Sequence, residues 1–326
     1  MAKGKTGFCR KNALRYNSIK VKKRKEDTGL MRKIRLRAPG KINWTLDVTG
    51  RRPDGYHEVE MLLQSIGLWD ELILTEKGKD VRIVGDLQGI PRNGDNLAVR
   101  AAEQIRESCG VDAGVEITIR KRIPAAAGLA GGSSDAAAVL VGLNALWDLD
   151  LPEERLRQLG SRLGADVPFC ILGGTALARG IGDKLTPLSP LEGIWLVLVK
   201  PPFGVSTASV YEAWTMESGT GHPDWKKAYD SLQAADFAGF PRGTANVLEP
   251  VIRAQHPEIR EIRQALRKAG AVASSMSGSG PTVFGVFPDY GQAQSASEKL
   301  KRHCVQTSQV YLVETLGQGV EILPSV

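Results

Sequence analysis

Hydrophobic and polar residues alternate along several stretches of this chain with the period of two that is typical of β-strands. The clearest stretch is 115–119, Val-Glu-Ile-Thr-Ile, in which every second side chain is apolar and most residues favour strands. The same reasoning predicts the remaining strands at 34–38, 44–48, 58–68, 71–75, 81–84, 167–172, 175–178, 194–199, 271–276, 282–287 and 310–315. A Pro-Gly pair at 39–40 predicts a turn between the first two strands.

Elsewhere apolar side chains recur three or four residues apart, which is the spacing of one helix face. This spacing predicts helices at 96–109, 136–147, 153–163, 208–217, 224–235, 257–269 and 292–303. Because strands and helices are mixed without a regular β-α-β alternation, we expect an α+β fold. Proline and glycine at 187–193 indicate a loop. We therefore expect two domains, an N-terminal one of residues 31–190 and a C-terminal one of residues 191–326.

The net charge of +7 comes from one segment of the chain. Residues 1–30 contain ten of the 43 Lys and Arg residues but only two of the 36 acidic residues, so the remaining chain has almost no net charge. Such a basic segment is consistent with an RNA-binding arm or an organelle transit peptide. We favour a disordered extension with no specific role, ahead of a domain that begins near Met31.

The composition of 42% hydrophobic and 24% charged residues is that of a globular protein, and no apolar stretch is long enough to span a bilayer. The four cysteines, Cys9, Cys109, Cys170 and Cys304, lie far apart in the sequence. Their spacing indicates neither a disulfide framework nor a zinc site. We expect free thiols in a reducing cytoplasm.

One loop is built almost entirely of small residues. It lies between the strand predicted at 115–119 and the apolar helix predicted at 136–147. Small side chains leave backbone N–H groups open at a helix N-terminus, where the helix dipole favours an anion such as a polyphosphate. The loop has neither the Gly-Lys-Ser/Thr of a Walker A motif nor a Gly-x-Gly-x-x-Gly fingerprint. We interpret it as a nucleotide-binding loop of another class, the alternative being a glycine-rich linker, and it comprises Pro124, Ala125, Ala126, Ala127, Gly128, Leu129, Ala130, Gly131, Gly132, Ser133 and Ser134.

The polar residues that end this loop have two interpretations. Ser133, Ser134 and Asp135 are residue types that favour helix N-caps, and capping is the role we expect for Asp135. The hydroxyl of Ser133 or Ser134 is also a candidate ligand for Mg²⁺.

Phosphoryl transfer also needs a cation to neutralise charge and a group that accepts the proton of the attacking hydroxyl. Lys41 is the candidate cation, although an exposed lysine in a turn is equally consistent with its position. Asp166, flanked by apolar residues between a predicted helix and a predicted strand, is the candidate base; its alternative role is to cap a turn.

Three segments together resemble the GHMP kinase family: 38–43 (Ala-Pro-Gly-Lys-Ile-Asn), 124–138, and 276–281 (Met-Ser-Gly-Ser-Gly-Pro). Their order and spacing agree with that family over about residues 33–317. The resemblance implies two parts, an N-terminal part similar to the second domain of ribosomal protein S5 and a ferredoxin-like C-terminal part. It also implies ATP as the phosphoryl donor, with Mg²⁺, and a small molecule as the acceptor.

Three further segments, 51–57, 94–97 and 163–168, resemble the branch of this family that phosphorylates the 2-hydroxyl of a cytidyl diphosphate sugar alcohol in non-mevalonate isoprenoid biosynthesis. The resemblance implies a role for each matching residue. Lys41 and Asp166 form the catalytic pair, Asn96 and Lys121 lie near the adenine, and the acceptor is held by Asn43, Tyr56, His57 and Tyr211.

Many members of the family have glycine where this chain has Ala125, Ala126, Ala127 and Ala130. Alanine permits the same close approach of the backbone where φ is negative, so we expect little change in the loop. The sequence is also compatible with two alternatives: another GHMP kinase, of the homoserine or mevalonate type, or an RNA-binding protein that uses the basic segment. We expect no membrane partner and no specific nucleic acid, and the sequence does not indicate an oligomeric state.

Overall fold

The computed structural model describes residues 32–85, 91–215, 221–237, 240, 245–303 and 308–324. The basic segment 1–30, Cys9 and Cys304 lie outside these residues, whereas Cys109 and Cys170 are free thiols, as expected. Internal contacts gather Met31–Val326 into one compact unit. The division of this unit at residue 190 stays a prediction.

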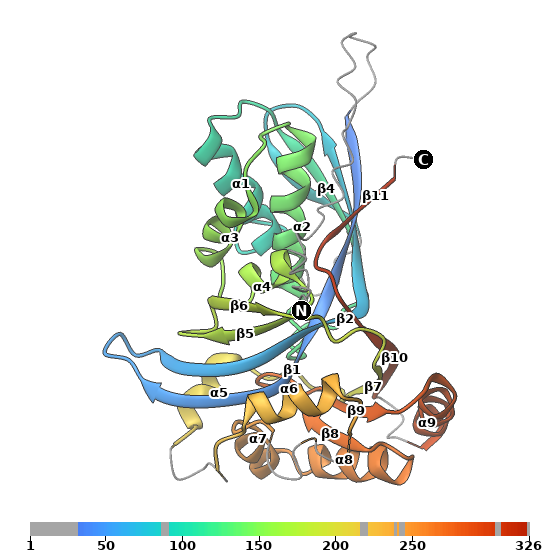
Figure 1. The fold of residues 1–326 in the computed structure, drawn as a ribbon. Coiled ribbons are helices and arrows are strands. Elements are labelled where there is room, and N and C mark those ends of the chain that lie inside the picture. Colours follow the sequence, from blue (N-terminus) through green and yellow to red (C-terminus); the bar gives the residue numbers. More distant parts are fainter. Residues whose placement is uncertain are drawn as a thin grey trace, which may run out of the picture. The chain divides into compact units, whose positions relative to one another are not determined.

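Two long antiparallel strands, β1 (Lys33–Arg51) and β2 (His57–Glu76), run through both halves of this unit (Figure 1). The breaks predicted at 39–43 and 69–70 are wrong, because each strand is continuous. The pairing register instead shifts between Pro39 and Gly40, where Pro39 pairs with Trp69 and Gly40 pairs with Ile66. A bulge of this kind bends a strand without reversing it, so it accommodates proline and glycine without a turn.

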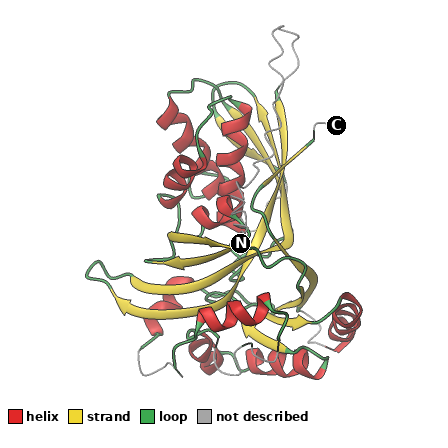
Figure 2. Ribbon diagram, viewed as in Figure 1, coloured by secondary structure: helices red, strands yellow, loops and turns green. Residues whose placement is uncertain are grey.

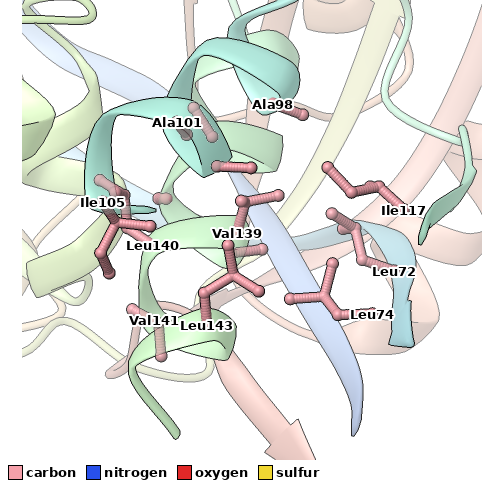
Figure 3. Close-up of a cluster of buried hydrophobic side chains, with 14 of the residues drawn as sticks. Leu72, Leu74, Ala98, Ala101, Ile105, Ile117, Val139, Leu140, Val141 and Leu143 are labelled. Carbon is pink, nitrogen blue, oxygen red and sulfur yellow. The ribbon is translucent and has the colours of Figure 1, made fainter. Parts of the chain in front are cut away.

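In the N-terminal half, helices cover one face of the sheet (Figure 2). The sheet contains β1, β2, β3 (Val81–Val84), β4 (Val115–Arg120), β5 (Thr175–Arg179), β6 (Lys184–Leu188) and β11 (Glu321–Leu323). The helices are α1 (Leu97–Cys109), α2 (Gly131–Leu146), α3 (Glu153–Ser161) and α4 (Val167–Leu172). Figure 3 shows the core between these layers, in which side chains of α1 and α2 meet Leu72, Leu74 and Ile117 of the sheet. Helix α2 is apolar on nearly every side because it is packed between the sheet and the other helices.

Residues 167–172, predicted as a strand, form helix α4 instead. A run of six apolar residues is too short for its periodicity to distinguish a strand from a buried helix. Pro168 is compatible with the first turn of a helix, where a backbone N–H is not needed, and this position was the available signal.

The C-terminal half follows the order β7 (Trp195–Lys200), α5 (Thr207–Ala213), α6 (Trp225–Gln233), α7 (Glu249–Gln255), α8 (Glu258–Lys268), β8 (Ala273–Met276), β9 (Val283–Phe287), α9 (Tyr290–His303) and β10 (Gln309–Leu316). Its strands lie in the order β10-β7-β9-β8, all neighbours being antiparallel. This is the ferredoxin-like arrangement that the resemblance implies, and the α+β class is confirmed. Strands β6 and β11 and helix α7 were not predicted.

Strand β10 joins the two halves, because its last residues pair with the middle of β2 at Ile66 and Ser65. The junction lies beside the β1–β2 bulge. The small-residue loop before α2 lies against the bulge, because the Lys41 amide donates to the Leu129 carbonyl oxygen over 3.1 Å. The hairpin loop between β8 and β9 lies against the small-residue loop, because the Ser277 hydroxyl donates to the Gly128 carbonyl oxygen. None of the helices within the described residues is both long and apolar enough to cross a bilayer.

Candidate active site

A cavity of about 1090 Å³ opens where these loops meet. Residues from β1, β2, the loop before α2, α2 itself, α5 and the β8–β9 loop line it. The structure brings nearly all of the predicted site residues to its wall: Lys41, Asn43, Tyr56, His57, Asn96, Lys121, Pro124, Ala125, Ala126, Ala127, Gly128, Ala130, Gly131, Gly132, Ser133, Asp166 and Tyr211. Leu129 and Ser134 are buried and do not line it.

The helix at this cavity begins at Gly131, five residues before the predicted start. The predicted N-caps Ser133, Ser134 and Asp135 are therefore wrong, because all three lie inside the helix. The hydroxyl of Ser134 donates to the carbonyl oxygen of Pro39 in β1. The N-cap residue is Ala130, which supplies no side-chain hydrogen bond to the first turn. The amides of that turn are consequently suited to a bound anion.

The loop backbone is left-handed at three positions, with φ of 47° at Ala126, 74° at Gly128 and 58° at Ala130. We expected alanine to replace glycine in this loop without change where φ is negative, but φ is positive at Ala126 and Ala130. Left-handed backbone costs an L-residue roughly 1–2 kcal/mol. The loop keeps the shape that glycine favours, at some strain.

The β8–β9 loop lies directly against this loop. The hydroxyl of Ser277 donates to the Gly128 carbonyl oxygen over 2.9 Å, and a Cβ added at Gly128 would lie 2.2 Å from the Ser277 carbonyl oxygen. No side chain fits between the two segments. On the other side, a Cβ at Gly278 would lie 3.3 Å from the Lys41 Nζ and from the Asn43 Oδ1. The two loops thus pack together next to the candidate catalytic lysine.

Lys41 is not an exposed turn residue, because only 4% of its surface is exposed and it lies in β1 just after the bulge. Its Nζ donates to Asn43 Oδ1 over 2.9 Å and lies 3.6 Å from Asp166 Oδ2. A buried ammonium is tolerated when such partners compensate for lost water. Asp166 is at the N-cap position of α4 but makes no side-chain capping bond, and its side chain is 32% exposed. The pair places a carboxylate beside an ammonium at the cavity surface.

Aromatic rings gather at the other end of the cavity. The ring centroid of His57 lies 5.4 Å from that of Tyr211 and 5.9 Å from that of Trp214. Burial lowers the pKa of His57, and the charge of Arg51 lowers it further, so the imidazole favours its neutral form. Tyr56 is 62% exposed at the rim. Trp214 was not predicted, although an aromatic residue three positions after Tyr211 is a signal for one helix face.

Asn96 and Lys121 lie on the same wall, each with defined partners. Asn96 caps α1, because its Oδ1 accepts from the Ala98 amide over 2.9 Å and its Nδ2 donates to the Pro91 carbonyl oxygen over 2.8 Å. Lys121 Nζ donates to Asp70 and, over 2.6 Å, to Asp135. Burial lowers the pKa of Lys121, but the charges of Asp135 and Asp70 outweigh it, so the net shift is upward. The lysine therefore stays charged.

Sequence reasoning missed Asn246, which supports the β8–β9 loop from behind. It is completely buried, and its Nδ2 donates to the carbonyl oxygens of Met276 and Gly278 over 2.8 and 2.7 Å. No pattern in the sequence marks it, because a lone asparagine in a loop is more typical of a turn.

Comparison with known proteins agrees with this geometry. Residues 96–174 match the model of the GHMP kinases N terminal domain, and residues 220–306 match that of the GHMP kinases C terminal region. The chain is therefore a GHMP kinase, a class of ATP-dependent kinases.

Two relatives narrow the class of kinase, and a third protein shares the fold. A 4-diphosphocytidyl-2-C-methyl-D-erythritol kinase of Alkaliphilus metalliredigens (strain QYMF) is 48% identical over 88% of this chain and 98% of that protein. A crystal structure of 4-(cytidine 5'-diphospho)-2C-methyl-D-erythritol kinase has a TM-score of 0.75 at 34% identity, covering 87% of this chain and all of the other. A homoserine kinase from Cytophaga hutchinsonii, with a TM-score of 0.71 at 21% identity over 90% of this chain and 98% of the other, shares the fold. The chain belongs to the 4-diphosphocytidyl-2-C-methyl-D-erythritol kinase family.

The contact between the two loops predicts an unequal response to alanine at two nearby glycines. Gly128→Ala should lower the free energy of unfolding by about 3 kcal/mol, because the new Cβ meets the Ser277 carbonyl and φ is positive. Gly132→Ala is the matched control, because its Cβ would be 3.7 Å from the nearest atom. Urea denaturation of both variants checks this. Equal stabilities would contradict the described packing.

Asp135 predicts how stability depends on pH. Burial raises its pKa from 3.8 to about 8; Lys121 opposes the rise and Asp70 adds to it. Between about pH 4 and pH 8 the folded protein therefore retains a proton that the unfolded chain loses, so this group lowers stability as pH rises. Asp135→Asn removes that titration. The free energy of unfolding of the variant, relative to the wild type, should increase from pH 5 to pH 8 in urea titrations; a constant difference would contradict the assignment.

Proposed function

We propose that this protein transfers the γ-phosphoryl group of ATP to the 2-hydroxyl of 4-diphosphocytidyl-2-C-methyl-D-erythritol, with Lys41 and Asp166 as its catalytic pair. The observation that carries the proposal is the 3.6 Å approach of Lys41 Nζ to Asp166 Oδ2 in the cavity that also holds the open helix N-terminus. The names of the relatives support the same acceptor.

The nucleotide end of the cavity is the loop that leads into α2. Its backbone amides and the positive end of the α2 dipole would hold the phosphates of ATP. Lys121 and Asn96, on the adjoining wall, would lie near the adenine. Asn96 Oδ1 caps α1 and one N–H of its Nδ2 donates to the Pro91 carbonyl oxygen, so the second N–H of Nδ2 would be the donor left for the adenine.

At the reacting centre, Asp166 would act as the general base. It would accept the proton of the 2-hydroxyl as the oxygen forms a bond to the γ-phosphorus, while the bond from that phosphorus to the β,γ-bridging oxygen breaks and ADP leaves. Lys41 would neutralise charge that develops on the transferred group. Asn43, whose Oδ1 accepts from Lys41, would orient this lysine and contact the methylerythritol portion.

Mg²⁺ fits one of the two candidate ligands. Ser133 lines the cavity near the helix start, whereas Ser134 is completely buried and donates to Pro39. A hydroxyl together with phosphate oxygens is the hard donor set that Mg²⁺ prefers. Ser133 would therefore be the protein ligand, and the ion would neutralise phosphate charge.

The aromatic end of the cavity would receive the cytosine. Tyr56, His57 and Tyr211 offer ring faces and polar edges, which suit a planar base with hydrogen-bonding groups. Homoserine and mevalonate kinases share the fold, but their acceptors contain no base to stack. An ATP-dependent assay with the cytidyl acceptor, mevalonate and homoserine tests the function directly. Turnover of the cytidyl acceptor alone is expected, and preference for another acceptor would refute the proposal.

The assignment of the base predicts a large loss in one carboxylate variant. Asp166→Asn should lower kcat by roughly 10²–10⁴-fold, because the amide cannot accept the hydroxyl proton. Asp112→Asn, at a surface ion pair with Lys79, is the control and should leave kcat unchanged. Steady-state kinetics with both substrates check this. A near-normal kcat for Asp166→Asn would mean that Asp166 does not act as the base.

The aromatic residues at the cavity predict that one variant loses affinity for the acceptor and not for ATP. His57→Ala should raise KM for the cytidyl acceptor about 5- to 100-fold, in keeping with the free energy of stacking a base, and leave KM for ATP unchanged. Determining both constants in one preparation provides the control. The assignment fails if KM for the acceptor stays at its wild-type value.

A further inference from the structure

A completely buried carboxylate, that of Asp70, lies behind the nucleotide end of the cavity. It belongs to β2, opposite Ala38 of β1. Its Oδ1 accepts from the backbone amides of Arg122 and Ile123 over 2.5 and 2.9 Å, and its Oδ2 accepts from Lys121 Nζ. One side chain therefore holds three consecutive residues, at the point where β4 leads into the small-residue loop.

Lys121 connects Asp70 to the cavity. Its side chain is 16% exposed and lines the wall, while its Nζ also donates to Asp135 in α2. An ammonium has three donors, and Asp70 and Asp135 use two of them. The third is available to an acceptor in the cavity, such as a purine ring nitrogen.

A clamp for two backbone amides needs only a neutral acceptor. A buried carboxylate is costly unless a cation compensates for its charge. The backbone amides use only Oδ1 of Asp70, and Lys121 is the cation that compensates for the charge through Oδ2. An unpaired lysine at this depth would adopt several rotamers or lose its proton. The geometry thus links Asp70 to the cavity through one fixed ammonium.

We propose that Asp70 is a positioning residue for the nucleotide: it fixes Lys121 and the start of the loop so that both are preorganised for ATP. The inference rests on the proposed function, in which the nucleotide binds at the Lys121 end of the cavity. Asp70 itself does not line the cavity, so it acts through Lys121 and the loop.

The test is Asp70→Asn, because the amide oxygen can still accept from Arg122 and Ile123 whereas the amide nitrogen cannot accept from Lys121. Binding of a non-hydrolysable ATP analogue is measured by calorimetry without acceptor, followed by steady-state kinetics. We expect Kd and KM for the nucleotide to rise at least 10-fold, with kcat and KM for the acceptor changing less than 3-fold. If Asp70 had a merely structural role, the constants for the nucleotide and those for the acceptor would change together.

The matched control is Glu71→Gln. Glu71 is adjacent to Asp70 and forms an ion pair with Arg122 at 3.1 Å, whereas the ion pairs of Lys121 are with Asp70 and Asp135. Its nucleotide affinity should stay within 2-fold of the wild-type value. An equal loss in both variants would overturn the proposal, since it would reflect general weakening of the strand.

Lys121→Gln tests the link independently of any effect of Asp70 on folding, because it leaves the backbone clamp intact. It should weaken nucleotide binding, and adding Asp70→Asn to it should change Kd less than 2-fold. Additive losses, or an unchanged Kd in Lys121→Gln, would overturn the inference. If the wild type does not bind the analogue, the proposed function fails. If the wild type and Asp70→Asn bind it equally, only the inference fails.

Discussion

The site depends on a contact in which no side chain fits. The backbone at Gly128 and the carbonyl of Ser277 approach so closely that a single methyl group would separate them, although about 150 residues lie between them in the chain. This approach sets the β8–β9 loop against the loop that leads into α2. It also puts Gly278 beside Lys41 and Asn43, so the cavity wall forms only when the N-terminal and C-terminal halves of the chain are packed together.

The packing of the two halves around the cavity also buries charged side chains. Lys41 and Lys121 have each lost most of their water, and each is compensated by carboxylate oxygens from other segments of the chain. Lys41 has a further partner in the Asn43 amide oxygen of the same strand. In a medium of low dielectric constant these interactions are stronger than at the surface, and the penalty for an unpaired partner is larger. The burial that makes these charges costly therefore also strengthens the interactions that hold them in fixed positions.

Periodicity in the sequence located most strands and helices. Residue chemistry located the small-residue loop, Lys41 and Asp166, and the resemblance added the other residues that line the cavity: Asn43, Tyr56, His57, Asn96, Lys121 and Tyr211. The errors have physical causes. The bulge at Pro39 and Gly40 looks like a turn in sequence, because proline and glycine occur in both. The first turn of α2 is rich in glycine and serine, which are poor helix formers, so tertiary packing decides its start. Asp70 lay between two predicted strands, and its burial depends on partners about 50 residues away.

Strand pairing also constrains the order in which the molecule is assembled. β11 completes the sheet beside β1, and β10 lies between β2 and β7, so the first long strand acquires its last neighbour from residues 321–323. Contacts of such large sequence separation are slow to form. The N-terminal half cannot complete its sheet while the ribosome is still making the C-terminal half. Until residues 321–323 have been made and have folded, the edge of β1 at residues 35–37 is open to pairing with other chains, and chaperones are a natural protection for it.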